Sequence, residues 1–323
     1  MKILVTGGAG FIGSHLVDRL AAEGHQVRVI DNLSSGRLEN LAHRRDVEVV
    51  IGDLKNPQDA QKAVRGVDAV FHFAANPEVR VSTTNPDIHF SENVVATFNL
   101  LEAMRKNDVT QLVFASSSSV YGEPPQIPVD EEAPLRPVSV YGASKAACEN
   151  LIHAYAKLYG FRAVALRYAN VVGPRLRHGV IWDLINKLKK NPHELEILGD
   201  GKQVRSYIYI DDAVEATLLA WRKATDAYAA YNVAAADWIT VDEVADQVIE
   251  AMGLTNVKKT YKPVLHGVGW PGDVKKIALK IDKIKQLGSK PLLNSKEAVK
   301  LTAKNLISEI LQEENRDDAH RID

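Results

Sequence analysis

The chain has 323 residues, enough for two domains or one large one. Its formal net charge is −1 and its charged fraction is 25%, which excludes a global field that favours nucleic acid or an acidic membrane. Cys148 is the only cysteine, so a disulfide within the chain and a cysteine metal cluster are excluded, and we expect no metal site. No apolar run approaches the ~18–20 residues of a membrane span. No signal-peptide pattern opens the chain, so we expect a cytoplasmic protein without a membrane partner.

The first predicted element is a strand, a glycine turn and a helix within KILVTGGAGFIGSHL, residues 2–16. Gly7, Gly10 and Gly13 follow the apolar strand at three-residue spacing. Such glycines allow a tight turn, a close approach of the backbone to a pyrophosphate, and close packing of the helix on the strand. The free N–H groups at the start of the helix would face the phosphates.

The second strand, QVRVID, ends at Asp31. A carboxylate at this place in a dinucleotide-binding unit is expected to bond a ribose 2′-hydroxyl. It also favours NAD over NADP, because its charge repels a 2′-phosphate. Arg37, a few residues further on, weakens that preference.

Strands and helices alternate up to about residue 170. The predicted strands span residues 47–51, 68–73, 111–115 and 162–167, and the predicted helices span 57–64, 86–106 and 139–159. Continuous apolar strands in this alternation predict an α/β fold, a Rossmann-type doubly wound parallel sheet with helices on both faces. Ligands should gather beyond the carboxyl ends of the strands.

The alternation loosens after residue 170. Helices are predicted at 179–190, 211–221, 241–252 and 295–311, with a strand, a Gly-Asp-Gly turn and a strand at 196–210. We expect a NAD-binding domain over 1–170 and a smaller mixed α/β substrate lobe over 171–323, partly interleaved with it. The polar tail EENRDDAHRID is expected to fray.

Three residues form the candidate catalytic group: Ser117, Tyr141 and Lys145. Tyr141 and Lys145 are four residues apart in YGASK, so they share a helix face. A free tyrosine has a pKa near ~10, and lowering it to ~7 takes roughly 4 kcal/mol. A nearby ammonium and the positive nicotinamide ring of NAD⁺ together could supply this. Ser117, at a strand end, could bond the reacting oxygen and relay its proton.

Seven segments together resemble one superfamily. They are TGGAGFIGSHL, DNLSSG, FHFAA, SSSSVYGE, YGASK, RYANVVGPR and GDGKQVRSYIYIDD. The chain is similar to the extended short-chain dehydrogenases/reductases, and among them to the NAD-dependent nucleotide-sugar epimerases, the UDP-glucose (UDP-galactose) 4-epimerases in particular. The resemblance covers residues 1–212 densely and the remainder thinly.

The resemblance implies a role for individual residues. Ser117, Tyr141 and Lys145 fall on the family's catalytic positions. A substrate nucleotide-sugar would meet Ser117, Asn170, Val180, Arg205 and Tyr207. The NAD contacts fall on Gly7, Gly10, Phe11, Ile12, Asp31, Asn32, Ser35, Gly36, Asp53, Leu54, Ala74, Ala75, Asn93, Tyr141 and Lys145.

The implied reaction inverts C4 of a UDP-sugar, with or without an N-acetyl group, through a 4-keto intermediate. Other oxidoreductases or dehydratases of the superfamily, and a non-catalytic dinucleotide sensor, are the alternatives. Ser118 and Ser119 stand where the related 4,6-dehydratases carry an Asp-Glu pair, which disfavours dehydration. Val268 stands where an arginine is usual near the diphosphate.

The helix at 139–159 carries two apolar stripes, of which one can pack on the sheet. The resemblance implies that the other takes part in a homodimer, through a four-helix bundle made with the helix at 86–106.

Overall fold

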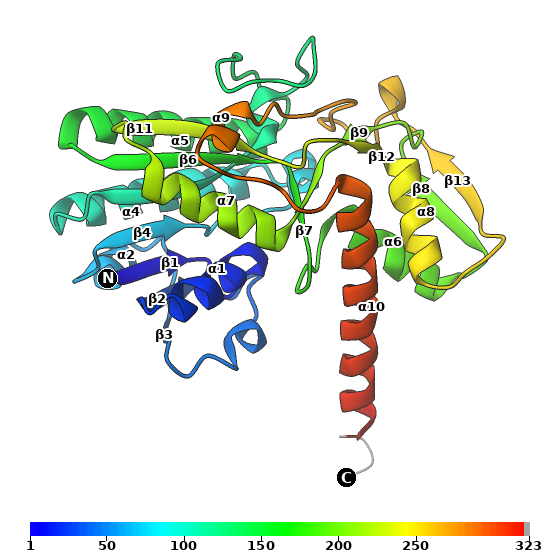
Figure 1. Cartoon of the computed structure of the whole chain (residues 1–323), viewed down its shortest axis with the longest axis horizontal. Coiled ribbons are helices and arrows are strands. Elements are labelled where there is room, and N and C mark those ends of the chain that lie inside the picture. Colours follow the sequence, from blue (N-terminus) through cyan, green and yellow to red (C-terminus); the bar gives the residue numbers. More distant parts are fainter. Residues whose placement is uncertain (320–323) are drawn as a thin grey trace.

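The computed structural model describes residues 1–319, of which Leu265 and 316–319 are described by their backbone alone. A seven-stranded sheet of parallel strands forms its centre, in the order β11-β6-β5-β4-β1-β2-β3 (Figure 1). The strands are β1 (Lys2–Thr6), β2 (Gln26–Asp31), β3 (Glu48–Ile51), β4 (Ala69–His72), β5 (Gln111–Ser117), β6 (Arg162–Tyr168) and β11 (Tyr228–Val233).

Helices cover both faces of this sheet, so the predicted doubly wound fold is confirmed. One apolar layer contains α1 (Phe11–Ala22) and α7 (Ile210–Lys223). The other contains α2 (Pro57–Val64), α4 (Ala96–Lys106) and α5 (Val140–Tyr159). Central strands such as β4 are buried along their whole length, which is why their sequences are continuously apolar.

The predicted helix at 86–106 is not one regular α-helix. It consists of α3 (Asp87–His89), a π-helical segment (Phe90–Val95) and α4. The extra residue in each π turn rotates the side chains that follow it, so regular helical spacing does not give the inward face here.

The second lobe is built around a third apolar cluster. Its helices are α6 (Gly179–Lys190), α8 (Val241–Ala251) and α10 (Ser295–Ala319), and the short α9 (Asp282–Gln286) lies beside β11. Its strands are β7 (Asn170–Val172), β8 (Glu194–Leu198), β9 (Val204–Arg205), β10 (Tyr207–Tyr209), β12 (Ile239–Thr240) and β13 (Lys258–Lys262).

The strands on either side of the Gly-Asp-Gly turn do not pair with one another. β8 pairs with β13, β9 with β12 and β10 with β7. The sheet also takes its seventh strand, β11, from beyond residue 170. The two lobes are therefore interleaved in sequence, and a domain border at residue 170 stays a prediction.

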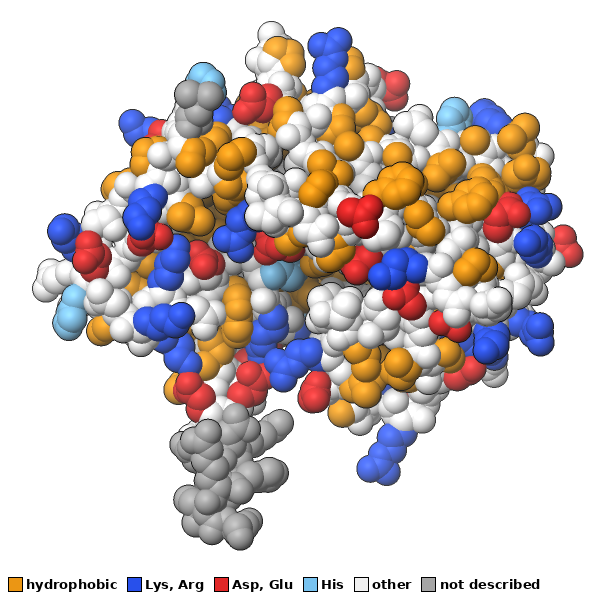
Figure 2. Space-filling view, turned by 180° about the vertical axis from the view of Figure 1, so that it is seen from behind, with side chains coloured by type: hydrophobic (Ala, Val, Ile, Leu, Met, Phe, Trp, Pro, Cys, Tyr) orange, Lys and Arg blue, Asp and Glu red, His pale blue; other side chains and the backbone are white. Residues whose placement is uncertain are grey.

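The tail that the sequence expects to fray from residue 313 is helical as far as it is described, because α10 continues to Ala319. Residues 320–323 lie outside the described part. Figure 1 shows α10 running down from the second lobe past β7 and α6. Among the described residues, no helix is long and apolar enough to cross a membrane. On the face shown in Figure 2, acidic and basic side chains are interspersed.

Candidate active site

A cavity of about 510 Å³ lies beyond the carboxyl ends of β1, β2, β4 and β5 and is lined by both lobes. All but one of the residues predicted for the cofactor, the catalysis and the substrate line it. The exception is Asn93, which is 2% exposed and lies in the π-helical segment behind the wall. Its amide donates to Ser144 Oγ at 2.8 Å and accepts from Asn76 N–H at 3.0 Å, so it supports the wall.

The glycine turn leaves the start of α1 open to this cavity. Gly7 has φ +67°, and a Cβ there would lie 2.7 Å from Ala74 N. A Cβ on Gly13 would lie 2.2 Å from the Gly7 carbonyl oxygen, so the helix can lie against the turn only with glycine at this position. Gly10 caps α1 without a side-chain bond, and no acidic residue occupies the first turn. The free N–H groups therefore fit a pyrophosphate.

Asp31 is 7% exposed and holds the turn as well as lining the cavity. Its carboxylate accepts from Ala9 N–H at 3.0 Å and from Leu33 N–H at 2.9 Å. Burial raises the pKa of Asp31, and these two backbone bonds act in the opposite direction. The same carboxylate thus holds the backbone of the glycine turn and lies where a ribose would bind.

Ser117, Tyr141 and Lys145 lie together on the cavity wall, from β5 and the first turns of α5. Ser117 Oγ accepts from the Ser119 N–H at 3.2 Å and from the Ser119 hydroxyl at 2.9 Å. Its own proton is therefore available to a group in front of it. Lys145 is 3% exposed, donates to the Ala115 carbonyl oxygen at 2.8 Å and has Nζ 5.9 Å from the centre of the Tyr141 ring.

The pKa of Tyr141 is raised in the protein alone, whereas the sequence predicts a lowered value for the phenol beside Lys145 and NAD⁺ together. Burial raises it to about 12, and a hydrogen bond with Ser117 acts to lower it. Burial likewise lowers the pKa of Lys145 to about 8. Desolvation is the largest cause of both shifts, because Lys145 is buried and Tyr141 is half-buried in the same wall. A positive charge that enters the cavity next to the phenol would favour its ionised form.

A buried ion pair fixes α5 against the sheet, one helical turn beyond Lys145. Glu149 Oε2 lies 2.7 Å from Arg167 Nη2, and the two side chains are 3% and 7% exposed. Ser116 donates to Glu149 Oε1 at 2.5 Å and Tyr228 donates to Oε2 at 3.1 Å. Breaking such a pair by removing one partner typically costs about 3–5 kcal/mol. The sequence reasoning missed this network, which holds the catalytic helix to β5, β6 and β11.

Arg205, expected near the diphosphate, is already paired in the second lobe. Its Nη2 lies 2.7 Å from Asp273 Oδ1, and both residues line the cavity. Asn170 is exposed on the same wall, where its amide donates to the Ser206 carbonyl oxygen at 3.1 Å. Val268, which stands where an arginine is usual, is 7% exposed and does not line the cavity. The chain therefore offers the diphosphate no cation from this position.

Other cavity residues were not predicted. Arg80 lies on a short 3-10 helix after β4, pairs with Glu78 at 3.1 Å, and has its guanidinium 5.8 Å from the Trp270 ring centre. Arg175 and Arg177 follow β7. The strand-end rule could have flagged Arg80 and the two later arginines, because all three follow strands at the ligand edge of the fold.

A family model described as the NAD dependent epimerase/dehydratase family matches residues 3–234. The chain belongs to this family. Its fold, its glycine turn and the cavity lining agree with this, and the protein is an NAD-dependent enzyme similar to UDP-glucose 4-epimerases.

Three relatives show how far the similarity extends. A putative UDP-glucose 4-epimerase of Methanocaldococcus jannaschii is 39% identical over 306 residues, covering 92% of this chain and 96% of the relative. A crystal structure of a UDP-galactose 4-epimerase is 50% identical, with a TM-score of 0.87 over 96% of this chain and 99% of that one. The UDP-glucose 4-epimerase of Thermus thermophilus, solved with NAD, is 37% identical, with a TM-score of 0.84 over 94% and 98%.

Proposed function

We propose that this enzyme inverts C4 of a UDP-sugar, with UDP-glucose and UDP-galactose as its substrates. The observation that carries the proposal is the position of Tyr141. It lies with Ser117 and Lys145 on the wall of the cavity that also contains the open start of α1. The similarity to UDP-galactose and UDP-glucose 4-epimerases supports the choice of sugar.

The cavity lining supports an assignment of residues to the two ligands. NAD would be held by the glycine turn, by Asp31 and its loop, and by the ends of β3 and β4, with Tyr141 and Lys145 at the nicotinamide end. This set is Gly7, Gly10, Phe11, Ile12, Asp31, Asn32, Ser35, Gly36, Asp53, Leu54, Ala74 and Ala75, and Asn93 acts from behind the wall. The nucleotide-sugar would contact Ser117, Asn170, Val180, Arg205 and Tyr207.

In the proposed mechanism, bound NAD⁺ supplies the oxidation of C4 and its reversal. Tyr141 takes the proton of the 4′-hydroxyl, and Ser117 donates a hydrogen bond to the same oxygen. Lys145 favours the ionised phenol through its charge. The diphosphate end must stay anchored while the 4-keto sugar turns its other face to the cofactor, so binding energy belongs on the nucleotide. Tyr141 then returns the proton to the new hydroxyl.

Dehydration of the sugar is the second candidate. A dTDP-glucose 4,6-dehydratase from Streptomyces venezuelae shares the fold at 28% identity, with a TM-score of 0.87. Water elimination needs an acid and a base placed after the catalytic serine. Ser118 and Ser119 occupy those places here and line the cavity, and neither has an acidic or basic side chain. This favours epimerisation. A non-catalytic sensor would not need the Ser117, Tyr141 and Lys145 group.

The test is incubation of the purified protein with UDP-galactose, without added NAD, followed by chromatography of the products. We expect UDP-glucose to form. A parallel incubation with UDP-N-acetylgalactosamine shows, by formation of UDP-N-acetylglucosamine, whether the cavity admits an N-acetyl group. Tyr141→Phe should reduce turnover by about 10²–10⁴-fold, because it removes the proton acceptor and little volume. Tyr159→Phe, an exposed tyrosine on the same helix, is the matched control.

Two outcomes would contradict the proposal. Loss of water from the sugar would identify a dehydratase. Normal turnover by the Tyr141→Phe protein would rule out this residue as the base.

We also propose that the protein is a homodimer formed through α4 and α5. Leu158 on α5 and Phe98 on α4 are 71% and 47% exposed, and Phe90 in the π-helical segment is 58% exposed. Apolar side chains exposed together on neighbouring helices favour a second copy as the partner. The cytoplasmic location stays a prediction of the sequence.

A further inference from the structure

One arginine lies beside the carboxylate expected to bind the ribose. Arg37 follows Gly36, at which a Cβ would lie 2.7 Å from Asp31 Oδ1. Its N–H donates to the carbonyl oxygen of Ala9 in the glycine turn at 3.0 Å, and the residue lines the cavity. An acid at the end of the second strand suits a 2′-hydroxyl, whereas a nearby arginine accommodates a 2′-phosphate. This chain carries both kinds of residue at one place.

The guanidinium of Arg37 has a carboxylate partner from the far end of the chain. Its Nη1 lies 3.2 Å from Glu313 Oε1, and its Nε lies 3.6 Å from Glu39 Oε2. The Glu313 oxygen also accepts from Arg177 Nη2 at 2.9 Å. Glu313 therefore bridges Arg37, in the loop after β2, and Arg177, in the loop after β7.

The position of Glu313 is set by the rest of α10. Ala303 and Leu306 bury the helix in the second lobe with exposures of 0%. One turn before Glu313, Glu309 lies 2.8 Å from Arg177 Nη1 and accepts from the Arg175 N–H at 3.0 Å.

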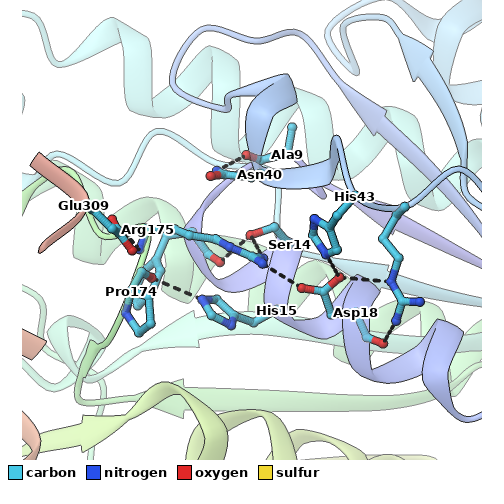
Figure 3. Close-up of polar contacts among 11 residues, drawn as sticks. Ala9, Ser14, His15, Asp18, Asn40, His43, Pro174, Arg175 and Glu309 are labelled. Carbon is cyan, nitrogen blue, oxygen red and sulfur yellow. Dashed lines mark hydrogen bonds and ion pairs between the residues drawn. The ribbon is translucent and has the colours of Figure 1, made fainter. Parts of the chain in front are cut away.

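Figure 3 shows Arg175 between Glu309 and the side chains of Ser14 and Asp18 on α1, at 3.1 Å and 2.9 Å. Residues 309–313 of α10 are thus held at the edge of the cofactor side by contacts to both lobes.

We propose that Glu313 is a specificity-determining residue for the cofactor, which favours NAD over NADP by holding Arg37. A 2′-phosphate would have to take Arg37 from Glu313 and would meet the carboxylate of Asp31. A ribose 2′-hydroxyl does not need Arg37. The pair is partly exposed, with side chains 41% and 43% accessible, so we expect an effect of about fivefold.

The experiment measures bound dinucleotide. The purified protein is equilibrated with NAD⁺ and NADP⁺ at several ratios, separated from free dinucleotide and denatured, and the two released cofactors are quantified. We expect Glu313→Gln to raise the ratio of bound NADP to bound NAD about fivefold, and 0.5 M salt to reduce that rise because the pair is partly exposed. Glu314→Gln is the matched control, since this neighbouring carboxylate pairs with Lys189.

A double-mutant comparison separates this role from a general one. In the Arg37→Ala background, Glu313→Gln should leave the ratio unchanged, because the cation that it would release is absent. An unchanged ratio in Glu313→Gln alone would overturn the proposal, as would an equal rise in both backgrounds. The readout is the identity of the bound cofactor, so a failure of the proposed epimerase activity would not affect it.

Discussion

At the scale of single residues, Lys145 shows that the candidate catalytic group opposes stability. The residue is 3% exposed, and burial lowers its pKa from 10.5 to about 8. A base whose pKa is lower in the folded state holds its proton less readily there than in the unfolded chain. Folding is therefore penalised below pH 8, where both states are charged, and the penalty disappears as the pH rises towards 10.5.

We therefore expect Lys145→Met to lose turnover but to raise the free energy of unfolding at pH 7 by about 1–3 kcal/mol. Loss of the bond to the Ala115 carbonyl oxygen offsets part of this gain. The measurement is denaturant unfolding at several pH values, with Lys62→Met on the exposed side of α2 as control. The gain should shrink between pH 8 and pH 10.5. A gain independent of pH would mean that the charge is not its cause.

At the scale of elements, two glycines at the start of α1 have different roles: one allows close packing of the turn, and the other lines the cavity. A Cβ on Gly13 would lie 2.2 Å from the Gly7 carbonyl oxygen, whereas the nearest atom to a Cβ on Gly10 is the same oxygen at 3.1 Å. Gly13 is therefore needed by the packing of the turn. Gly10 has φ −75°, which any residue can adopt, and it lines the cavity.

We expect Gly13→Ala to destabilise the protein by about 1–3 kcal/mol, because the turn and helix must move apart. Gly10→Ala should leave the stability of the protein without added NAD nearly unchanged but reduce the rise in melting temperature that NAD produces. Thermal unfolding with and without NAD measures both effects. Equal destabilisation by the two substitutions would show that Gly10 also serves packing and would contradict its role at the pyrophosphate.

The elements that the sequence predicts well are those specified by their own residues. The second strand ends at Asp31 as its apolar run predicts, and α2 begins and ends at the predicted residues. The fifth strand continues to Ser117, two residues beyond its predicted end. Strand partners are not local: β8, β9 and β10 each pair with a distant strand. The role of Asn93 stays a prediction from the resemblance. It does not line the cavity and lies in the π-helical segment, where a period of 3.6 residues does not give the direction of a side chain.

At the scale of the whole molecule, the site depends on contacts between segments that are far apart in the sequence. Arg37 and Glu313 are 276 residues apart, and Glu149 reaches strands β5, β6 and β11. No pattern in a single sequence specifies such pairs. The sequence predicts the wall of the cavity, because strand ends share one edge, but the partners of its charged residues depend on how the second lobe and α10 pack.

The proposed dimer is tested at this scale. Ala154 is exposed in the stripe of α5 that also contains Leu158, and an arginine there would place a charge and extra volume in the contact between copies. We expect Ala154→Arg to convert a dimer into a monomer in sedimentation velocity at micromolar concentration. Ala22→Arg, at an exposed alanine that ends α1, is the matched control.

Because α5 also carries Tyr141 and Lys145, the monomer should retain NAD less well if the bundle steadies that helix. A wild-type protein that sediments as a monomer, or a dimer that survives Ala154→Arg, would contradict the bundle through α4 and α5.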